Sequence, residues 1–200
     1  MFAVLLDTCV LWPSLQRDFL LSLAVEGLYR PMWSDRILVE LEIGERAKLI
    51  ARGDDEVDAT NRAHRLVSVL ATRFDDALVR NWEPHEGTFG LPDPNDEHVV
   101  AAAVVGGAGA IVTNNLRDFP HDRVSDCLVV RTAAQFAADT VSVSPDAAVL
   151  ALRTMLGRSD RAIAADPAEP GLPVGRVVWQ FGQRRAGMTS RSKSSMPEVS

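Results

Sequence analysis

The chain has 200 residues, of which 46% are hydrophobic, and it carries a formal net charge of −6 at pH 7. This length and apolar content allow one domain with an appendage, and the acidic balance argues against a broadly basic surface that coats nucleic acid. No stretch has the length and apolarity of a transmembrane span, and the first residues lack the basic segment of a signal peptide.

Segments typical of strands and helices alternate along the first 82 residues. Residues 2–6 are continuously apolar, as in a strand that is buried on both faces, and Ser34 followed by Asp35 is typical of a helix start. The predicted elements are a strand at 2–6, a helix from about 12 or 14 to 26, a strand at 28–33, a helix beginning at Ser34, a helix within 52–81 and a strand or edge element at 74–82.

The alternation continues after a Pro- and Gly-rich loop at 83–94. We predict a helix at Asp96, strands at 109–113 and 127–131, and helices starting at residues 133 and 144, with Gly106 to Gly109 as the turn that ends the Asp96 helix. This order favours an α/β fold, a three-layer α/β/α sandwich with a central, mainly parallel sheet. The predicted domains are an α/β domain at 1–135, a helical extension at 136–163, and a linker with a basic tail at 164–200.

Three acidic residues lie where such a fold gathers polar groups. Asp7 directly follows the first strand, Asp96 lies on the first turn of a very apolar helix, and Glu40 lies on the mostly apolar helix after Ser34. Carboxylates at the carboxyl ends of parallel strands, and on the helix starts beside them, face one crevice. Because clustered carboxylates repel one another, such a group persists most easily around a hard divalent cation.

Each acid also has a simpler interpretation. Asp7 and Asp96 could be plain helix caps, and Glu40 could face water, with Glu42 as the competing choice on that helix. The polar residues Thr113, Asn115 and Asp118 follow an apolar strand, so they too belong to the carboxyl edge of the sheet.

Several other sites are excluded by their motifs. An EF-hand calcium loop fails because His98 stands where glycine is required and Val104 where the final glutamate is required. A haloacid-dehalogenase-like phosphatase needs a second aspartate where Cys9 stands, and no Walker, GxGxxG, GxSxG or HExxH motif occurs. The two cysteines, Cys9 and Cys127, form no CxxC pair, which argues against zinc and favours buried free thiols in a reducing cytoplasm.

Four motifs occur in an order and spacing that point to one family. They are Leu5-Leu6-Asp7-Thr8, Ser34-x-x-Ile37-Leu38-Val39-Glu40-Leu41, Asp93-x-x-Asp96-x-His98-Val99-Val100-Ala101-Ala102-Ala103, and Val112-Thr113-Asn114-Asn115-Leu116-x-Asp118-Phe119-Pro120. Over roughly residues 1–135 the chain resembles the PIN-domain family, and within it the VapC-type toxins of toxin–antitoxin pairs. The later residues resemble the helical extension of longer members.

This resemblance implies a Mg²⁺- or Mn²⁺-dependent ribonuclease. By motif position Asp7, Glu40 and Asp96 are the acidic metal-site residues, and the fourth catalytic position falls on Asn115, where many members have aspartate. Asp118 is an alternative ligand, and Cys9 replaces the asparagine often found at its position.

The roles that we expect at this site follow from phosphodiester chemistry. Asp7 and Asp96 hold the main ion, and Glu40 orients water or holds the ion directly. We expect the remaining three residues to position ligands or phosphate: the hydroxyls of Thr8 and Thr113, and the guanidinium of Arg117.

The resemblance to VapC-type toxins implies a toxin ribonuclease that acts on RNA, forms a homodimer and is inhibited by a small cognate antitoxin. The main alternative is a non-catalytic PIN-like module that binds RNA or protein through a metal site impaired at Asn115. A nuclease directed at DNA is a third possibility.

Charge is distributed unevenly along the chain. Residues 158–200 hold seven Lys or Arg and four Asp or Glu, whereas the other residues hold 14 Lys or Arg and 23 Asp or Glu. The basic region 176–193 is expected to strengthen binding to RNA or a partner in a salt-dependent way.

Overall fold

The computed structural model describes residues 1–124 and 128–165. The predicted linker and basic tail, and Cys127, lie outside the described residues. Contacts divide the chain into a compact unit at 1–155 and a second unit at 156–200, of which the structure describes the end of one helix.

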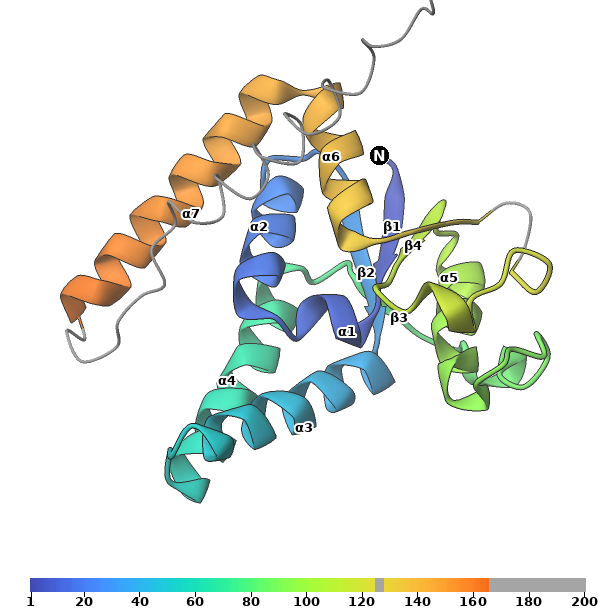
Figure 1. Ribbon diagram of the computed structural model, residues 1–200, viewed down its shortest axis with the longest axis horizontal. Helices are drawn as coiled ribbons and strands as arrows, with labels where there is room; N and C mark the ends of the chain where they lie inside the picture. Colours follow the sequence, from blue (N-terminus) through green and yellow to red (C-terminus); the bar gives the residue numbers. More distant parts are fainter. Residues whose placement is uncertain (125–127, 166–200) are drawn as a thin grey trace, which may run out of the picture. The chain divides into compact units, whose positions relative to one another are not determined.

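A five-stranded parallel sheet forms the centre of the first unit (Figure 1). Its order is β3-β2-β1-β4-β5, with β1 paired to β2 and to β4 through Leu5 opposite Met32 and Ile111. The strands are β1 (Ala3–Leu6), β2 (Arg30–Ser34), β3 (Leu78–Val79), β4 (Ala110–Val112) and β5 (Val129–Arg131). The predicted parallel sheet is confirmed.

Helices cover both faces of this sheet, so the predicted three-layer sandwich is also confirmed. On one face α5 (Glu97–Gly106) packs on β1 to β4, and α2 (Ser14–Val25), α3 (Asp35–Ala51) and α6 (Ala133–Val143) contact the sheet from the other face (Figure 1). The helices are α1 (Thr8–Leu11), α2 (Ser14–Val25), α3 (Asp35–Ala51), α4 (Glu56–Arg73), α5 (Glu97–Gly106), α6 (Ala133–Val143) and α7 (Pro145–Ala165).

The central strands are apolar throughout because both faces of the sheet are covered. Val4, Leu5 and Ile111 have no exposed surface, as expected for parallel strands between two helical layers. Helix α5 lies close to β2, since a Cβ on Gly106 would come within 2.2 Å of the Met32 methyl carbon. Gly107 then ends α5 in the left-handed region at φ 67°, as the glycine-rich segment predicted.

A short helix that the sequence did not predict precedes the predicted one. The segment predicted as a helix from about 12 or 14 to 26 contains α2, and α1 already begins at Thr8, directly after Asp7. Pro13 separates them, because proline has no N–H to continue the hydrogen bonds of α1, and it adopts an extended conformation before α2. Asp7 is consequently the N-cap residue of α1, at the junction of strand and helix.

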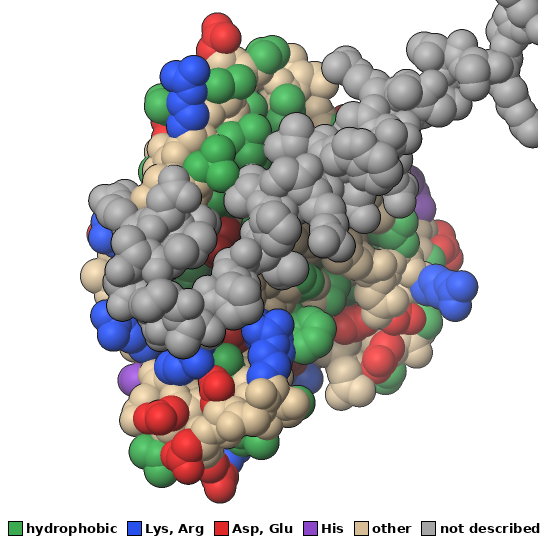
Figure 2. All heavy atoms as spheres, turned by 60° about the vertical axis from the view of Figure 1, so that its left-hand side comes forward, with side chains coloured by type: hydrophobic (Ala, Val, Ile, Leu, Met, Phe, Trp, Pro, Cys, Tyr) green, Lys and Arg blue, Asp and Glu red, His purple; other side chains and the backbone are tan. Residues whose placement is uncertain are grey.

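The surface carries charges of both signs. On the face shown in Figure 2, acidic and basic side chains of the described residues are interspersed and do not gather into one broad basic area. Within residues 1–124 and 128–165, no helix is long and apolar enough to cross a membrane.

The sheet order creates a crevice at its carboxyl edge. The connection that leaves β1 leads to β2 on one side, while β4 lies on the other side of β1. Neighbouring strands whose connections run in opposite directions leave a gap between their carboxyl ends, where open α/β sheets bind ligands. Asp7 follows β1 and Thr113 follows β4, so both predicted site residues lie at this switch point.

Candidate active site

Asp7 is fixed between the two strands of the switch point. Its backbone N–H donates to the carbonyl of Val112 (3.0 Å), which extends the pairing of β1 with β4 by one residue. Its Oδ2 accepts hydrogen bonds from the Thr113 hydroxyl (2.6 Å) and the Cys9 thiol (3.0 Å). Although Asp7 is the N-cap residue of α1, its side chain makes no capping bond, so the carboxylate is held by its neighbours and not by the helix end.

Cys9 acts as a hydrogen-bond donor beneath this carboxylate. Burial, followed by the charge of Asp7 and the hydrogen bond to it, raises the pKa of the thiol to about 12. The thiol therefore stays protonated at neutral pH and donates to Asp7, which is the part an amide N–H could play at this position.

Asp96 brings a second carboxylate to the same place from the start of α5. It is the N-cap residue of that helix but makes no capping bond with its side chain. Partial burial, and then the negative charges of Asp7, Asp93 and Asp118, raise the pKa of Asp96 to about 6, with His98 acting in the opposite direction. The half-buried carboxyl of Asp96 therefore lies in a region of net negative charge.

Asn115 lies between the acids and donates to two of them. Its Nδ2 donates to Asp96 Oδ2 (3.4 Å) and to Asp118 Oδ2, and its backbone N–H donates to the Thr113 hydroxyl (3.0 Å). The amide thus offsets part of the repulsion that an aspartate at position 115 would increase.

Glu40 completes the group from α3. Its Oε2 accepts a hydrogen bond from the Thr8 hydroxyl (2.7 Å), and its Oε1 lies 3.3 Å from His98 Nε2 and 3.4 Å from Arg36 Nε. Burial raises the pKa of Glu40, but the hydrogen bonds from His98 and Thr8 and the positive charges of His98 and Arg36 outweigh it, and the pKa is lowered overall. Glu40 therefore stays ionised and links α1, α3 and α5.

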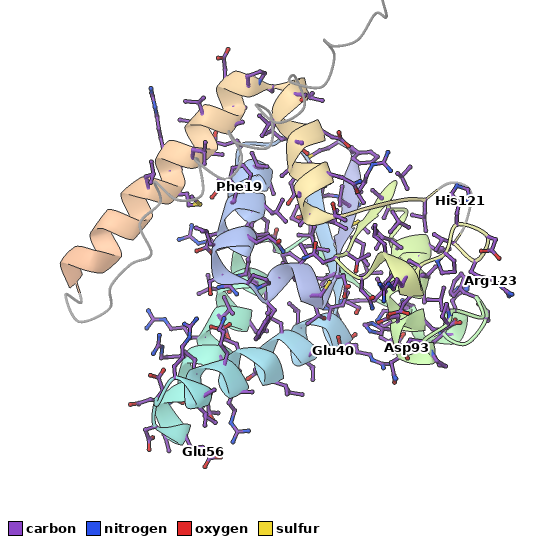
Figure 3. All side chains as sticks on the ribbon, viewed as in Figure 1. Phe19, Glu40, Glu56, Asp93, His121 and Arg123 are labelled. Carbon is purple, nitrogen blue, oxygen red and sulfur yellow. The ribbon has the colours of Figure 1, made fainter. Side chains whose placement is uncertain are left out.

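The loop before α5 is adjacent to Glu40. Figure 3 shows Glu40 on α3 and Asp93 on that loop at the same edge of the molecule, and Arg36 connects the two elements through the Asn95 carbonyl (3.5 Å). Asp93 caps its own short turn by accepting from the backbone N–H of Asn95 (2.9 Å), so its carboxylate is engaged locally.

A pocket of about 350 Å³ opens among these side chains. Five of the predicted site residues line it, together with Cys9, Trp12 and Gly44: Asp7, Thr8, Glu40, Asp96 and Asn115. Thr113 is fully buried behind Asp7, and Asp118 is connected through Asn115. Arg117 is exposed on the turn Leu116–Asp118 and does not line the pocket.

Sequence reasoning gave no role to His98 or Trp12. His98 is 1% exposed and holds Glu40 through Nε2, while its Nδ1 has no hydrogen-bond partner among the described residues. The sequence feature that could have identified His98 is its position on the first turn of a helix that is otherwise almost wholly apolar. Trp12 had no such signal, since an aromatic residue near a strand end usually belongs to the core.

The side chains fit a hard divalent cation by their chemistry. Asp7, Asp96 and Asn115 offer oxygen donors, which Mg²⁺ and Mn²⁺ prefer. Burial, and then the neighbouring carboxylates, raise the pKa of Asp96, and a bound cation would balance the charge of these carboxylates. Within the described part of the chain, no three His, Cys, Asp or Glu side chains are clustered closely enough to form a binding group by themselves. Oxygen donors of this kind hold a Mg²⁺ ion through few direct bonds while the ion retains several waters.

Comparison with known families agrees with this geometry. The family model described as PIN domain matches residues 3–117. The chain belongs to the PIN domain family. The matched part runs from β1 to the turn after β4, so all eight residues that line the pocket of this PIN domain lie within it. Searches of curated proteins and of solved structures found no match.

Proposed function

We propose that this PIN-domain protein is a Mg²⁺- or Mn²⁺-dependent endoribonuclease that hydrolyses phosphodiester bonds of RNA at the pocket between Asp7 and Asp96. The observation that carries the proposal is the half-buried carboxyl of Asp96, whose pKa is raised to about 6 beside three other acids. Such a concentration of negative charge opposes folding, and it is typical of sites that bind a cation.

Different residues of the pocket would bind the metal ion in different ways. Asp7 and Asp96 hold the ion, and Asn115 contributes its amide oxygen after rotation of the side chain or leaves the position to Asp118. A bound Mg²⁺ would supply charge neutralisation at the phosphoryl oxygens and a hydroxide nucleophile near neutral pH.

Glu40 is suited to orient the attacking water. It is ionised, lines the pocket, and is fixed from two sides by Thr8 and His98. Thr113 holds Asp7 in place, and Thr8 offers its hydroxyl to Glu40, so both threonines act through the acids. Arg117, exposed beyond the pocket, is proposed to contact an RNA phosphate.

We further propose that this ribonuclease is the toxin of a type II toxin–antitoxin pair, because its four motifs resemble those of VapC-type toxins. It implies a cytoplasmic homodimer and a small antitoxin protein that inhibits cleavage. The gene next to this one should then encode an inhibitor, and co-expression of the two proteins should abolish RNA cleavage.

Cleavage of total cellular RNA by the purified protein tests the activity. With Mg²⁺ or Mn²⁺ we expect discrete cuts, mapped by sequencing of the new ends, that are lost with EDTA and in Asp7→Asn and Asp96→Asn. Asp122→Asn, which changes an exposed carboxylate outside the pocket, is the matched control and should cut normally. Unchanged cutting by folded Asp7→Asn would overturn the site assignment.

One observation favours the alternative of a binding module without catalysis. Asn115 replaces a charge with an amide that donates to two of the acids, which weakens the attraction for a cation. If folded protein cuts no RNA with either ion but still binds RNA or a partner protein, this alternative replaces the ribonuclease.

A further inference from the structure

Trp12 forms one wall of the acidic pocket and is substantially exposed. Its side chain is 44% exposed and lines the pocket together with Asp7, Glu40 and Asp96. It follows α1, the four-residue helix that starts immediately after Asp7. One four-residue helix therefore separates the indole from Asp7.

The ring of Trp12 is held in place by α3. A Cβ on Gly44 would lie 3.0 Å from Cδ1 and 3.1 Å from Nε1 of the indole, so the pyrrole edge rests where the helix has no side chain. The ammonium of Lys48 lies 5.6 Å from the ring centroid, and it also donates to the Trp12 carbonyl (3.3 Å). Glycine in the middle of a helix is unfavourable, and here it makes room for an aromatic ring at the surface.

Lys48 is itself anchored by buried charged groups. It is ion-paired with Glu45, which is 9% exposed and lies 3.8 Å from the buried guanidinium of Arg17. Arg17 donates to the Leu11 carbonyl (3.0 Å), at the end of α1 next to Trp12. The buried charges thus join α1, α2 and α3 around one exposed indole.

We propose that Trp12 is a nucleobase-stacking subsite, on which one base of single-stranded RNA lies while the adjacent phosphate faces the acidic pocket. This inference rests on the proposed ribonuclease function. Every base has an aromatic face, so a fixed indole binds RNA with little sequence preference. Asp7, Glu40 and Asp96 line the pocket and the whole chain has a net charge of −6, so without a bound cation the RNA phosphates gain little here and a base contact adds to binding.

The pocket is of the right size for this arrangement. Its volume of about 350 Å³ lies at the lower end of the range for small-ligand sites, roughly 300–1,000 Å³, which suits one nucleotide and not a folded protein segment. Phe2 offers a matched control for Trp12, because it is also exposed (54%) and also packs on a glycine, Gly109. Phe2 precedes β1, at the opposite edge of the sheet from the pocket.

The test compares two probes of equal charge, oligo(A) RNA of about twelve nucleotides, a length within the usual site sizes, and the same ribose-phosphate chain without bases. Binding is measured by fluorescence anisotropy in EDTA, so that metal-dependent hydrolysis does not contribute. We expect the wild-type chain to prefer oligo(A), and Trp12→Ala to weaken oligo(A) binding by about 5- to 100-fold while leaving the abasic chain unaffected. Trp12→Phe should retain most of the preference, and Phe2→Ala all of it.

The outcomes separate this inference from the proposed function. If Trp12→Ala, shown to be folded by its circular dichroism, prefers oligo(A) as strongly as the wild type, the stacking subsite is refuted, even where metal-dependent cleavage is observed. That result would also be expected if Trp12 instead contacted a protein partner. If the preference depends on Trp12 but no RNA is cut with either ion, the subsite stands and the ribonuclease proposal fails.

Discussion

At the scale of single residues, the strongest physical signal in this protein is the carboxyl of Asp96. Its pKa is raised to about 6, whereas an aspartate in an unfolded chain has a pKa of about 3.9. Between these two pH values the folded state binds more protons than the unfolded state, so ionisation of Asp96 lowers stability as the pH rises through this window.

The first prediction concerns this carboxyl. Without added divalent ions, Asp96→Asn should stabilise the protein at pH 8 by on the order of 1 kcal/mol, since the partly exposed group is screened by solvent. The gain should disappear below about pH 4, where the wild-type carboxyl is also protonated in the unfolded state. Thermal unfolding between pH 4 and 8 measures it, with Asp122→Asn as control. A gain that is independent of pH would contradict the electrostatic explanation.

The second prediction concerns the amide of Asn115. Asn115→Asp removes the donor to Asp96 and Asp118 and adds a negative charge, so the variant should be less stable in EDTA and bind Mg²⁺ more tightly. A tenfold gain in affinity, about 1.4 kcal/mol, is a reasonable expectation. Isothermal titration with Mg²⁺ measures it, and Asn114→Asp, one residue away, is the control. Equal affinity in variant and wild type would place the ion away from Asn115.

At the scale of elements, α5 organises the loop that precedes it. Glu97, its first residue, is 3% exposed and accepts hydrogen bonds from the backbone N–H groups of Phe89 (3.0 Å) and Leu91 (2.8 Å). Burial raises the pKa of Glu97, but hydrogen bonds from the backbone of Leu91, Phe89, Gly90 and Gly87 outweigh it and lower the pKa overall. Glu97 thereby shapes the loop that leads to Asp96.

The third prediction follows from these bonds. Glu97→Ala should destabilise the protein by about 2 to 4 kcal/mol at pH 7, because it leaves the buried N–H of Leu91 and the partly buried N–H of Phe89 without these partners. The difference should narrow in acid, since a carboxylate with a lowered pKa stabilises only above that pKa. Urea unfolding at pH 7 and pH 4 measures it. Glu56→Ala, an exposed first residue of α4, is the matched control and should cost less than about 1 kcal/mol.

At the scale of the whole molecule, the chain separates charge along its length. The PIN domain holds the acidic pocket, whereas the region 176–193, outside the described residues, contains five basic and no acidic residues. Cations that pair with RNA phosphates release counterions, which makes such binding sensitive to salt.

The fourth prediction is that truncation after residue 165 weakens RNA binding in low salt and flattens its salt dependence. The slope of log K against log salt should fall by up to about 0.7 for each phosphate that the shortened chain no longer neutralises. Anisotropy titrations at several KCl concentrations measure it, and replacement of the five basic residues by glutamine in the full chain separates charge from length. Equal affinity and slope in both variants would remove any role for the region in binding RNA.

Local sequence patterns determined most of the secondary structure and the position of the crevice. The unbroken apolar run before Asp7 requires a strand covered on both faces, and Ser34 caps α3 through its bond from the Ile37 N–H as its position predicted. The alternation of strands and helices predicts the parallel sheet, and the acids after strands and at helix starts predict its crevice.

The tertiary structure alone decided how the side chains of the pocket meet. The contact between Asp7 and Thr113 joins residues far apart in sequence and depends on the strand order. The contact between Glu40 and His98 depends on helices from opposite faces of the sheet. The same holds for Trp12, whose indole packs against Gly44 in another helix. Local sequence patterns indicate which face of a helix or strand is apolar. The distance between two polar atoms is instead set by the packing of the whole fold.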